Sequence, residues 1–70
     1  MMPLCFADAE TTYVIKKIGG NHDVKLHLEN LGFHIGGEVS IVSVVNNNLV
    51  VKVKETRIAL SSELAKRIMV

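Results

Sequence analysis

Hydrophobic and polar positions alternate most regularly in the second half of the chain. Between residues 49 and 54, apolar side chains take one face and lysines the other: Leu49, Val51 and Val53 against Lys52 and Lys54. This is the two-residue period of a half-buried β-strand. The segment 38–45 also predicts a strand, but its phase changes, so we expect a bulge or a sharp bend near Val42 that lets both sets of apolar side chains reach the core. The three asparagines at 46–48 predict a turn that joins the two strands into a hairpin.

Two further strands and two helices are expected around this hairpin. Residues 11–18 and 57–60 are short segments with the composition of strands, and a tight connection at 55–56 would precede the second of them. A helix is predicted over 22–31, because an N-cap, an apolar stripe and a C-cap glycine follow in order: Asn21, then Val24, Leu28 and Leu31, then Gly32. A last helix is expected from Ser62 to about Met69.

The predicted order of elements is strand, helix, hairpin, strand and helix, which is a mainly β protein. Strands this short cannot bury both faces of a flat sheet. A small antiparallel sheet that curls into a barrel, with one or two short flanking helices, is therefore the expected architecture. With 70 residues, we expect one domain over residues 1–70.

Composition limits the class of protein and its compartment. Hydrophobic residues make up 49% and aromatic residues 4% of the chain, so we expect a folded domain with an aliphatic core. Cys5 is the only cysteine, which excludes an intrachain disulfide and a cysteine-based zinc site. No signal peptide is apparent, and the uncharged stretch 39–51 is too short to span a bilayer. A cytoplasmic protein without membrane insertion is expected.

The charge balance argues against a nucleic-acid partner. Eight basic and seven acidic residues give a net charge of +1, whereas nucleic-acid binders of this size usually have a larger basic excess. Lys52, Lys54 and Arg57 could form a basic strip on the outside of the barrel. Interleaved aromatic residues are absent there, so a solvated surface is the simplest interpretation.

Candidate metal ligands are few, and no catalytic motif is present. Asp23 and His27 are four residues apart on the predicted helix and share a face. His22 and His34 complete the set of possible divalent-metal ligands. Such residues are more often simply exposed to solvent, without a ligand. There is no phosphate-binding glycine loop, no paired-histidine motif and no oriented nucleophile. We therefore expect no enzymatic activity.

Two motifs resemble those of a known family. Residues 28–39, LENLGFHIGGEV, resemble the pattern L-x-x-L-G-h-x-x-G-x-x-V, in which h is apolar. Residues 51–65, VKVKETRIALSSELA, resemble the ending V-x-V-x-x-x-R-h-A-L-s-x-x-h-A. Both patterns are typical of FeoA, the small cytosolic protein of bacterial ferrous-iron uptake. The resemblance covers nearly the whole chain.

The resemblance implies an SH3-like barrel with added helices, no catalysis, and action on the cytosolic part of FeoB, a membrane transporter with a GTPase domain. A similar domain also ends iron-dependent repressors of the diphtheria-toxin type. Candidate partner contacts are Phe33, His34 and Arg57. No cofactor is firmly implied, although Fe²⁺ could bind. A divalent-metal-binding regulatory domain and a general protein-interaction module are the alternatives, and an unpaired barrel edge offers a route to a homo-oligomer.

Overall fold

Six strands and three helical segments build the fold in a computed structural model that describes residues 1–70. In chain order they are a short 3₁₀ helix η1 (Leu4–Phe6), strands β1 (Thr12–Val14) and β2 (Lys17–Ile18), helix α1 (His22–Leu31), strands β3 (Glu38–Val45), β4 (Asn48–Val53) and β5 (Thr56–Ser61), helix α2 (Ser62–Ala65) and strand β6 (Ile68–Met69). The predicted mainly β architecture is confirmed.

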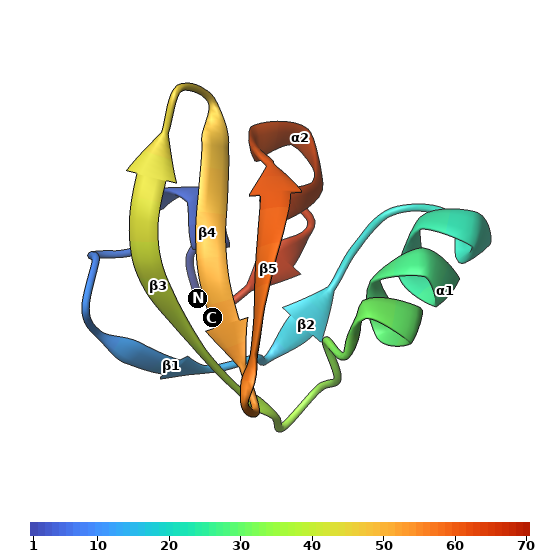
Figure 1. Cartoon of the computed structure of the whole chain (residues 1–70). Helices are drawn as coiled ribbons and strands as arrows, with labels where there is room; N and C mark the ends of the chain where they lie inside the picture. The colour runs from blue at the N-terminus through green and yellow to red at the C-terminus, as the bar shows by residue number, and fades with distance from the viewer.

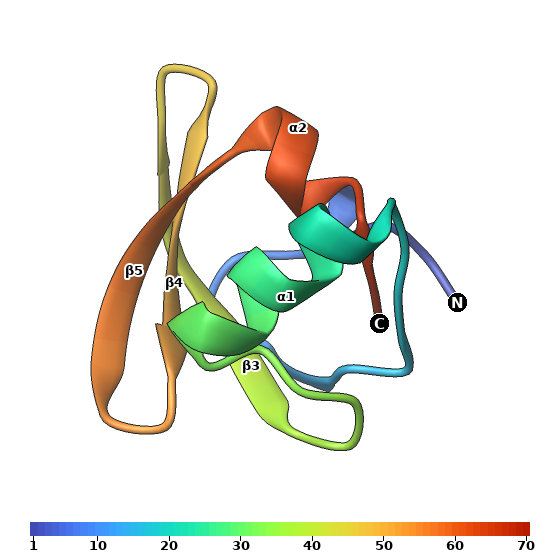
Figure 2. The same ribbon diagram turned by 90° about the vertical axis from the view of Figure 1, so that its right-hand side faces the viewer.

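The strands form two antiparallel sheets. The larger sheet has the order β1-β3-β4-β5, and β2 pairs with β6 in the smaller one. Figure 1 looks onto the outer face of the larger sheet. In Figure 2, turned by 90°, α1 and α2 lie on the opposite, inner side. The outer face is thus left without a covering helix, and β1 and β5 are the two ends of the larger sheet.

The predicted bulge curves β3. Its register with β4 shifts between Ile41 and Ser43, so Val42 is the extra residue. A bulge bends its strand and increases the local twist. Before it, Val39 and Ile41 point into the core with 1% of their surface exposed. Beyond the bulge, Val44 and Val45 are 62% and 54% exposed, so only Val39 and Ile41 of this strand reach the core and the end of the hairpin extends past it.

The turns of the sheet use residues with positive φ. The hairpin turn begins at Asn46, with φ 56°, as the asparagine run predicts. The β4–β5 turn lies at Lys54 and Glu55, with φ 57° at Lys54. The prediction of a connection at 55–56 is one residue late, because Thr56 already pairs with Val53.

Helix α1 has the predicted bounds and both predicted caps. The Asn21 side chain accepts a hydrogen bond of 2.9 Å from the Val24 backbone N–H. Gly32 takes a left-handed conformation with φ 108°. Its N–H donates to the Glu29 carbonyl, and the Phe33 N–H donates to the Leu28 carbonyl, both at 3.0 Å. This pair of bonds is a Schellman motif, which ends the helix and turns the chain back toward the core.

The two ends of the chain depart from the expected elements. The predicted strand 11–18 is interrupted between β1 and β2, and the predicted last helix ends at Ala65 instead of Met69. The cause is tertiary pairing. The Lys16 N–H donates to the Met69 carbonyl at 2.8 Å, and Met2 and Val70 exchange two backbone hydrogen bonds of 2.9 Å. The last residues of the predicted helix therefore form a strand that pairs with β2 on one side and with the N-terminal segment on the other.

The core between the sheets and helices is aliphatic, apart from one phenylalanine. Fourteen residues are buried, and none of them is polar or charged. They are Leu4, Ile15, Ile18, Leu28, Phe33, Val39, Ile41, Leu49, Val51, Val53, Leu60, Ala65, Ile68 and Val70. No helix of the chain has the length and apolar character needed to cross a membrane.

Candidate partner-binding surface

Four polar residues lie in one line across the outer face of the larger sheet. Thr12 of β1 is opposite Ser40 of β3, Ser40 is opposite Lys52 of β4, and Lys52 is opposite Arg57 of β5. Each of these side chains has a hydrogen-bond donor. We call this set the donor row. It crosses all four strands of the sheet.

The alternation of the strands places the donor row outside. Residues on either side of it in sequence, such as Val39, Val51 and Val53, are at most 4% exposed. Because successive side chains of a strand point to opposite faces, burial of these valines turns Ser40 and Lys52 outward. Thr12, Lys52 and Arg57 are exposed, and Ser40 is half-buried.

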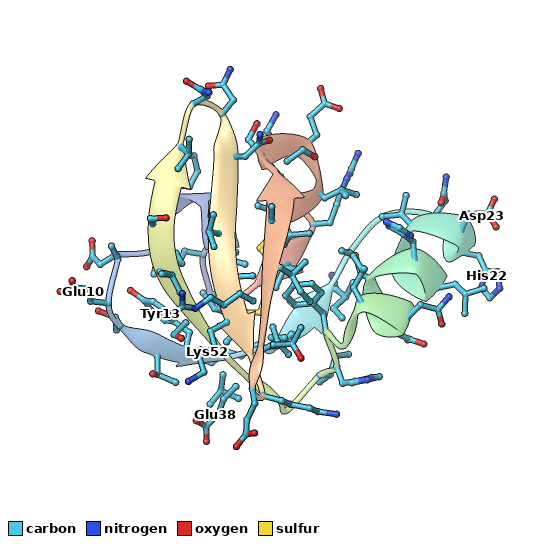
Figure 3. All side chains as sticks on the ribbon, viewed as in Figure 1. Glu10, Tyr13, His22, Asp23, Glu38 and Lys52 are labelled. Atoms are coloured by element: carbon cyan, nitrogen blue, oxygen red, sulfur yellow. The ribbon has the colours of Figure 1, made fainter.

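The outer face is hollowed beside Lys52. A shallow polar groove of about 490 Å³ lies there. It is lined by Thr12, Gly36, Glu38, Val39, Ser40, Lys52 and Lys54. Figure 3 shows Lys52 and Glu38 together at the lower part of the sheet. Gly36, with φ 88°, lines the groove and belongs to the turn that leads from α1 to β3.

Positive charge on this face is only partly balanced. Within the groove, the single carboxylate of Glu38 accompanies the two ammonium groups of Lys52 and Lys54. Glu55 adds a second exposed carboxylate in the β4–β5 turn. Lys52 nevertheless lies directly opposite Arg57, and like charges in directly opposed positions destabilise an antiparallel pair.

No side-chain hydrogen bond holds these cations. The four side-chain hydrogen bonds of the structure involve Asp8 with Tyr13, Thr11 with Ala9, Val24 with Asn21, and Leu64 with Ser61. Neither Lys52, Lys54 nor Arg57 takes part in one. Their donor groups are therefore available to a partner.

The structure separates the three predicted partner contacts. Arg57 is exposed at one end of the donor row, and His34 is exposed on the turn that carries Gly36. Phe33 is wrong as a direct contact, because its side chain is fully buried. It occupies the position after the C-cap glycine, where an apolar residue packs back on the last turn of the helix. That local pattern, a glycine followed by an apolar residue, could have predicted its burial.

The predicted metal ligands are not assembled into a site. His22, Asp23, His27 and His34 are all exposed. Figure 3 shows His22 and Asp23 at the start of α1, far from Lys52. No group of three or more His, Cys, Asp or Glu side chains is placed to hold a metal ion. Cys5 is half-buried against the core.

Comparison with known proteins gives the family. The sequence model of the FeoA domain matches residues 2–70. A protein of Methanocaldococcus jannaschii that is named as an Fe(2+) transport protein A is 30% identical over 70 residues, which are all of this chain and 85% of that protein. This chain belongs to the FeoA family. It is therefore grouped with the accessory proteins of ferrous-iron transport.

Solved structures confirm the SH3-like fold. FeoA of Stenotrophomonas maltophilia, solved with zinc and described as a prokaryotic SH3 domain protein, is 32% identical, with a TM-score of 0.84 over 99% of this chain and 88% of that one. Iron(II) transport protein A of Clostridium thermocellum is 25% identical, with a TM-score of 0.89 over 97% of this chain and 43% of that one. ScaR with bound Zn²⁺ shares the fold at 20% identity, with a TM-score of 0.87 over 97% of this chain and 35% of that one.

Proposed function

We propose that this FeoA-family chain is a non-enzymatic accessory of ferrous-iron uptake that docks on the cytosolic part of a FeoB-type transporter and modulates it. The chain would act in the cytoplasm, without membrane insertion and without nucleic acid. Family membership supports the role in iron transport. Docking is supported by one observation above all, the exposed donor row with Arg57 at its end and no helix over it.

Binding to the isolated cytosolic domain of the matching transporter tests this proposal. Titration with and without ferrous iron should give saturable binding. Arg57→Glu should weaken that binding, whereas Lys66→Glu should leave it unchanged, because Lys66 is exposed beyond α2 on the other side of the sheet. Absence of binding under both conditions, to the isolated domain and to the intact transporter, would contradict the proposal.

A divalent-metal-binding role is the second candidate, and the zinc complex of the Stenotrophomonas maltophilia relative is the observation that favours it. The ligands would come from His22, Asp23, His27 and His34. Direct binding would raise the melting temperature with excess Fe²⁺, Mn²⁺ or Zn²⁺. Unchanged melting with all three ions would remove this candidate. The remaining hypothesis is a general protein-interaction module, in which the donor row binds a partner other than the transporter.

A further inference from the structure

We propose that the donor row binds an acidic, extended segment of the partner protein, laid across the strands on the outer face of the sheet. The inference rests on the proposed function only for the identity of that partner. It is argued from the side chains of four residues on four different strands, which the strand register places side by side: Thr12, Ser40, Lys52 and Arg57.

The donor row is chemically suited to carboxylates. Lys52 and Arg57 have donors and no acceptor, and the planar guanidinium matches both oxygens of a carboxylate. Directly opposed residues of an antiparallel pair have their Cβ atoms about 5 Å apart. Lys52 and Arg57 could therefore share one carboxylate or hold two neighbouring ones. The hydroxyls of Ser40 and Thr12 continue the line of donors on the other side of Lys52.

The dimensions of the row fit an extended segment. Neighbouring strands lie about 4.8 Å apart, so a line across four strands is about 14 Å long. Alternate side chains of an extended peptide are about 7 Å apart. Two acidic residues separated by one position could thus contact Lys52 and Arg57 at one end and the hydroxyls at the other. The adjoining groove, which Lys54 and Gly36 help to line, could hold the continuation of the segment.

The fold itself gains nothing from the opposed cations. An opposite-charge pair at these two positions would stabilise the sheet, whereas two like charges destabilise it. Both side chains are exposed and neither is held by a hydrogen bond within the chain. An acidic partner would supply the missing negative charge, which accounts for an arrangement that the isolated sheet does not favour.

A phosphate backbone is the main chemical competitor for this surface. Single-stranded nucleic-acid binders add aromatic side chains on which bases stack. The sheet has one aromatic residue, Tyr13, which is half-buried and whose hydroxyl oxygen accepts a hydrogen bond from the Asp8 N–H at 3.0 Å. The net charge of +1 also gives little general attraction for nucleic acid. These observations favour a protein segment.

Peptide titration followed by NMR tests the inference directly. Isotope-labelled protein is titrated with a hexaglutamate peptide at low salt and at about 150 mM NaCl. The backbone amide shifts should change most at Thr12, Ser40, Lys52 and Arg57, and a hexalysine peptide should change none of them. Shifts centred instead on α1 or on the β2–β6 sheet would overturn the inference.

Charge reversal with a matched control separates the donor row from general electrostatics. Lys52→Glu/Arg57→Glu should weaken binding of hexaglutamate about tenfold or more, because two charge-assisted contacts are lost. Lys66→Glu/Arg67→Glu makes the same change of net charge at exposed positions after α2. It should weaken binding by less than about threefold. Equal losses in both variants would overturn the inference.

A single reversal guards against effects of misfolding. Lys52→Glu creates an opposite-charge pair with Arg57, so the melting temperature should rise by a few degrees, roughly 1–4 °C, while binding of hexaglutamate falls. Lys52→Arg should keep both stability and binding. Stability and affinity that fall together in Lys52→Glu would show a structural role for Lys52 and contradict the proposal.

Two further titrations identify the occupant and separate this inference from the transporter proposal. Oligothymidylate that binds more tightly than hexaglutamate at the same salt would overturn the acidic protein segment in favour of nucleic acid. Hexaglutamate binding at the row without binding to the transporter would support this inference and contradict the docking proposal. Binding to the transporter that neither charge-reversal pair weakens would support the docking proposal and contradict this inference.

Discussion

The two faces of the larger sheet are built from the same strands but have opposite chemistry. On the inner face, Val39, Val51 and Val53 are nearly free of solvent and pack in a core without a polar residue. On the outer face, Ser40, Lys52 and Arg57 lie side by side. The inner face thus supplies the hydrophobic stabilisation. The outer face contains a like-charge pair that opposes it. If the outer face binds the partner as proposed, stability and binding should be separable by mutation.

Phe33→Ala should have the largest effect, because it leaves a cavity in the hydrophobic core against which the inner face packs. Its side chain is fully buried, and truncation of a buried phenylalanine costs about 3–5 kcal/mol. Urea unfolding followed by circular dichroism measures the loss. Phe6→Ala is the matched control, since Phe6 is 74% exposed and should change the free energy of unfolding by less than about 0.5 kcal/mol. Equal losses would show that the assignment of the core is wrong.

Gly32→Ala should have the next largest effect, because it strains the turn that sends Phe33 into the core. Gly32 has φ 108°, and a left-handed conformation costs a residue with a side chain about 1–2 kcal/mol. An added Cβ would lie 3.6 Å from Val53, an ordinary contact, so the loss is conformational. Gly19→Ala is the control, because its nearest atom is also 3.6 Å away and its φ is not positive. Thermal melting should show a clear loss for Gly32→Ala alone.

Asn21→Ala should cost about 1 kcal/mol, the usual value for the loss of an N-cap side chain. The lost bond is that from the Val24 N–H, 2.9 Å long. Asn30→Ala on the exposed surface of the same helix removes the same amide without such a bond. It should be neutral or slightly stabilising. Binding of the folded protein should not change in either variant, since α1 lies on the inner side.

Arg57→Glu should have the smallest effect on stability, with the opposite sign. It places a carboxylate opposite Lys52, and such a pair stabilises a sheet by roughly 0.2–1 kcal/mol. The same variant should bind an acidic partner less tightly. A titration beside a melting curve therefore shows affinity falling as stability rises. A drop in stability would contradict the separation of the two faces.

Local patterns in the sequence carried much of the fold. Three such patterns each involve residues that are close in sequence: the alternation of residues 49–54, the caps of α1, and the change of phase near Val42. Their energetics depend on residues close in sequence, so the pattern is sufficient. Arg57 and His34 are exposed as the partner role requires. That role, the docking site on the transporter and a homo-oligomer through an unpaired edge of the sheet stay predictions.

Long-range pairing decided the remaining features. Residues 62–69 satisfy a helical pattern, yet Ile68 and Met69 become a strand because β2 and the N-terminus offer hydrogen bonds and a buried position. The donor row also depends on long-range pairing. Thr12, Ser40, Lys52 and Arg57 have no common spacing along the chain and meet only through strand register. Local periodicity determines which face of an element is buried, whereas contacts between distant segments determine which exposed side chains become neighbours.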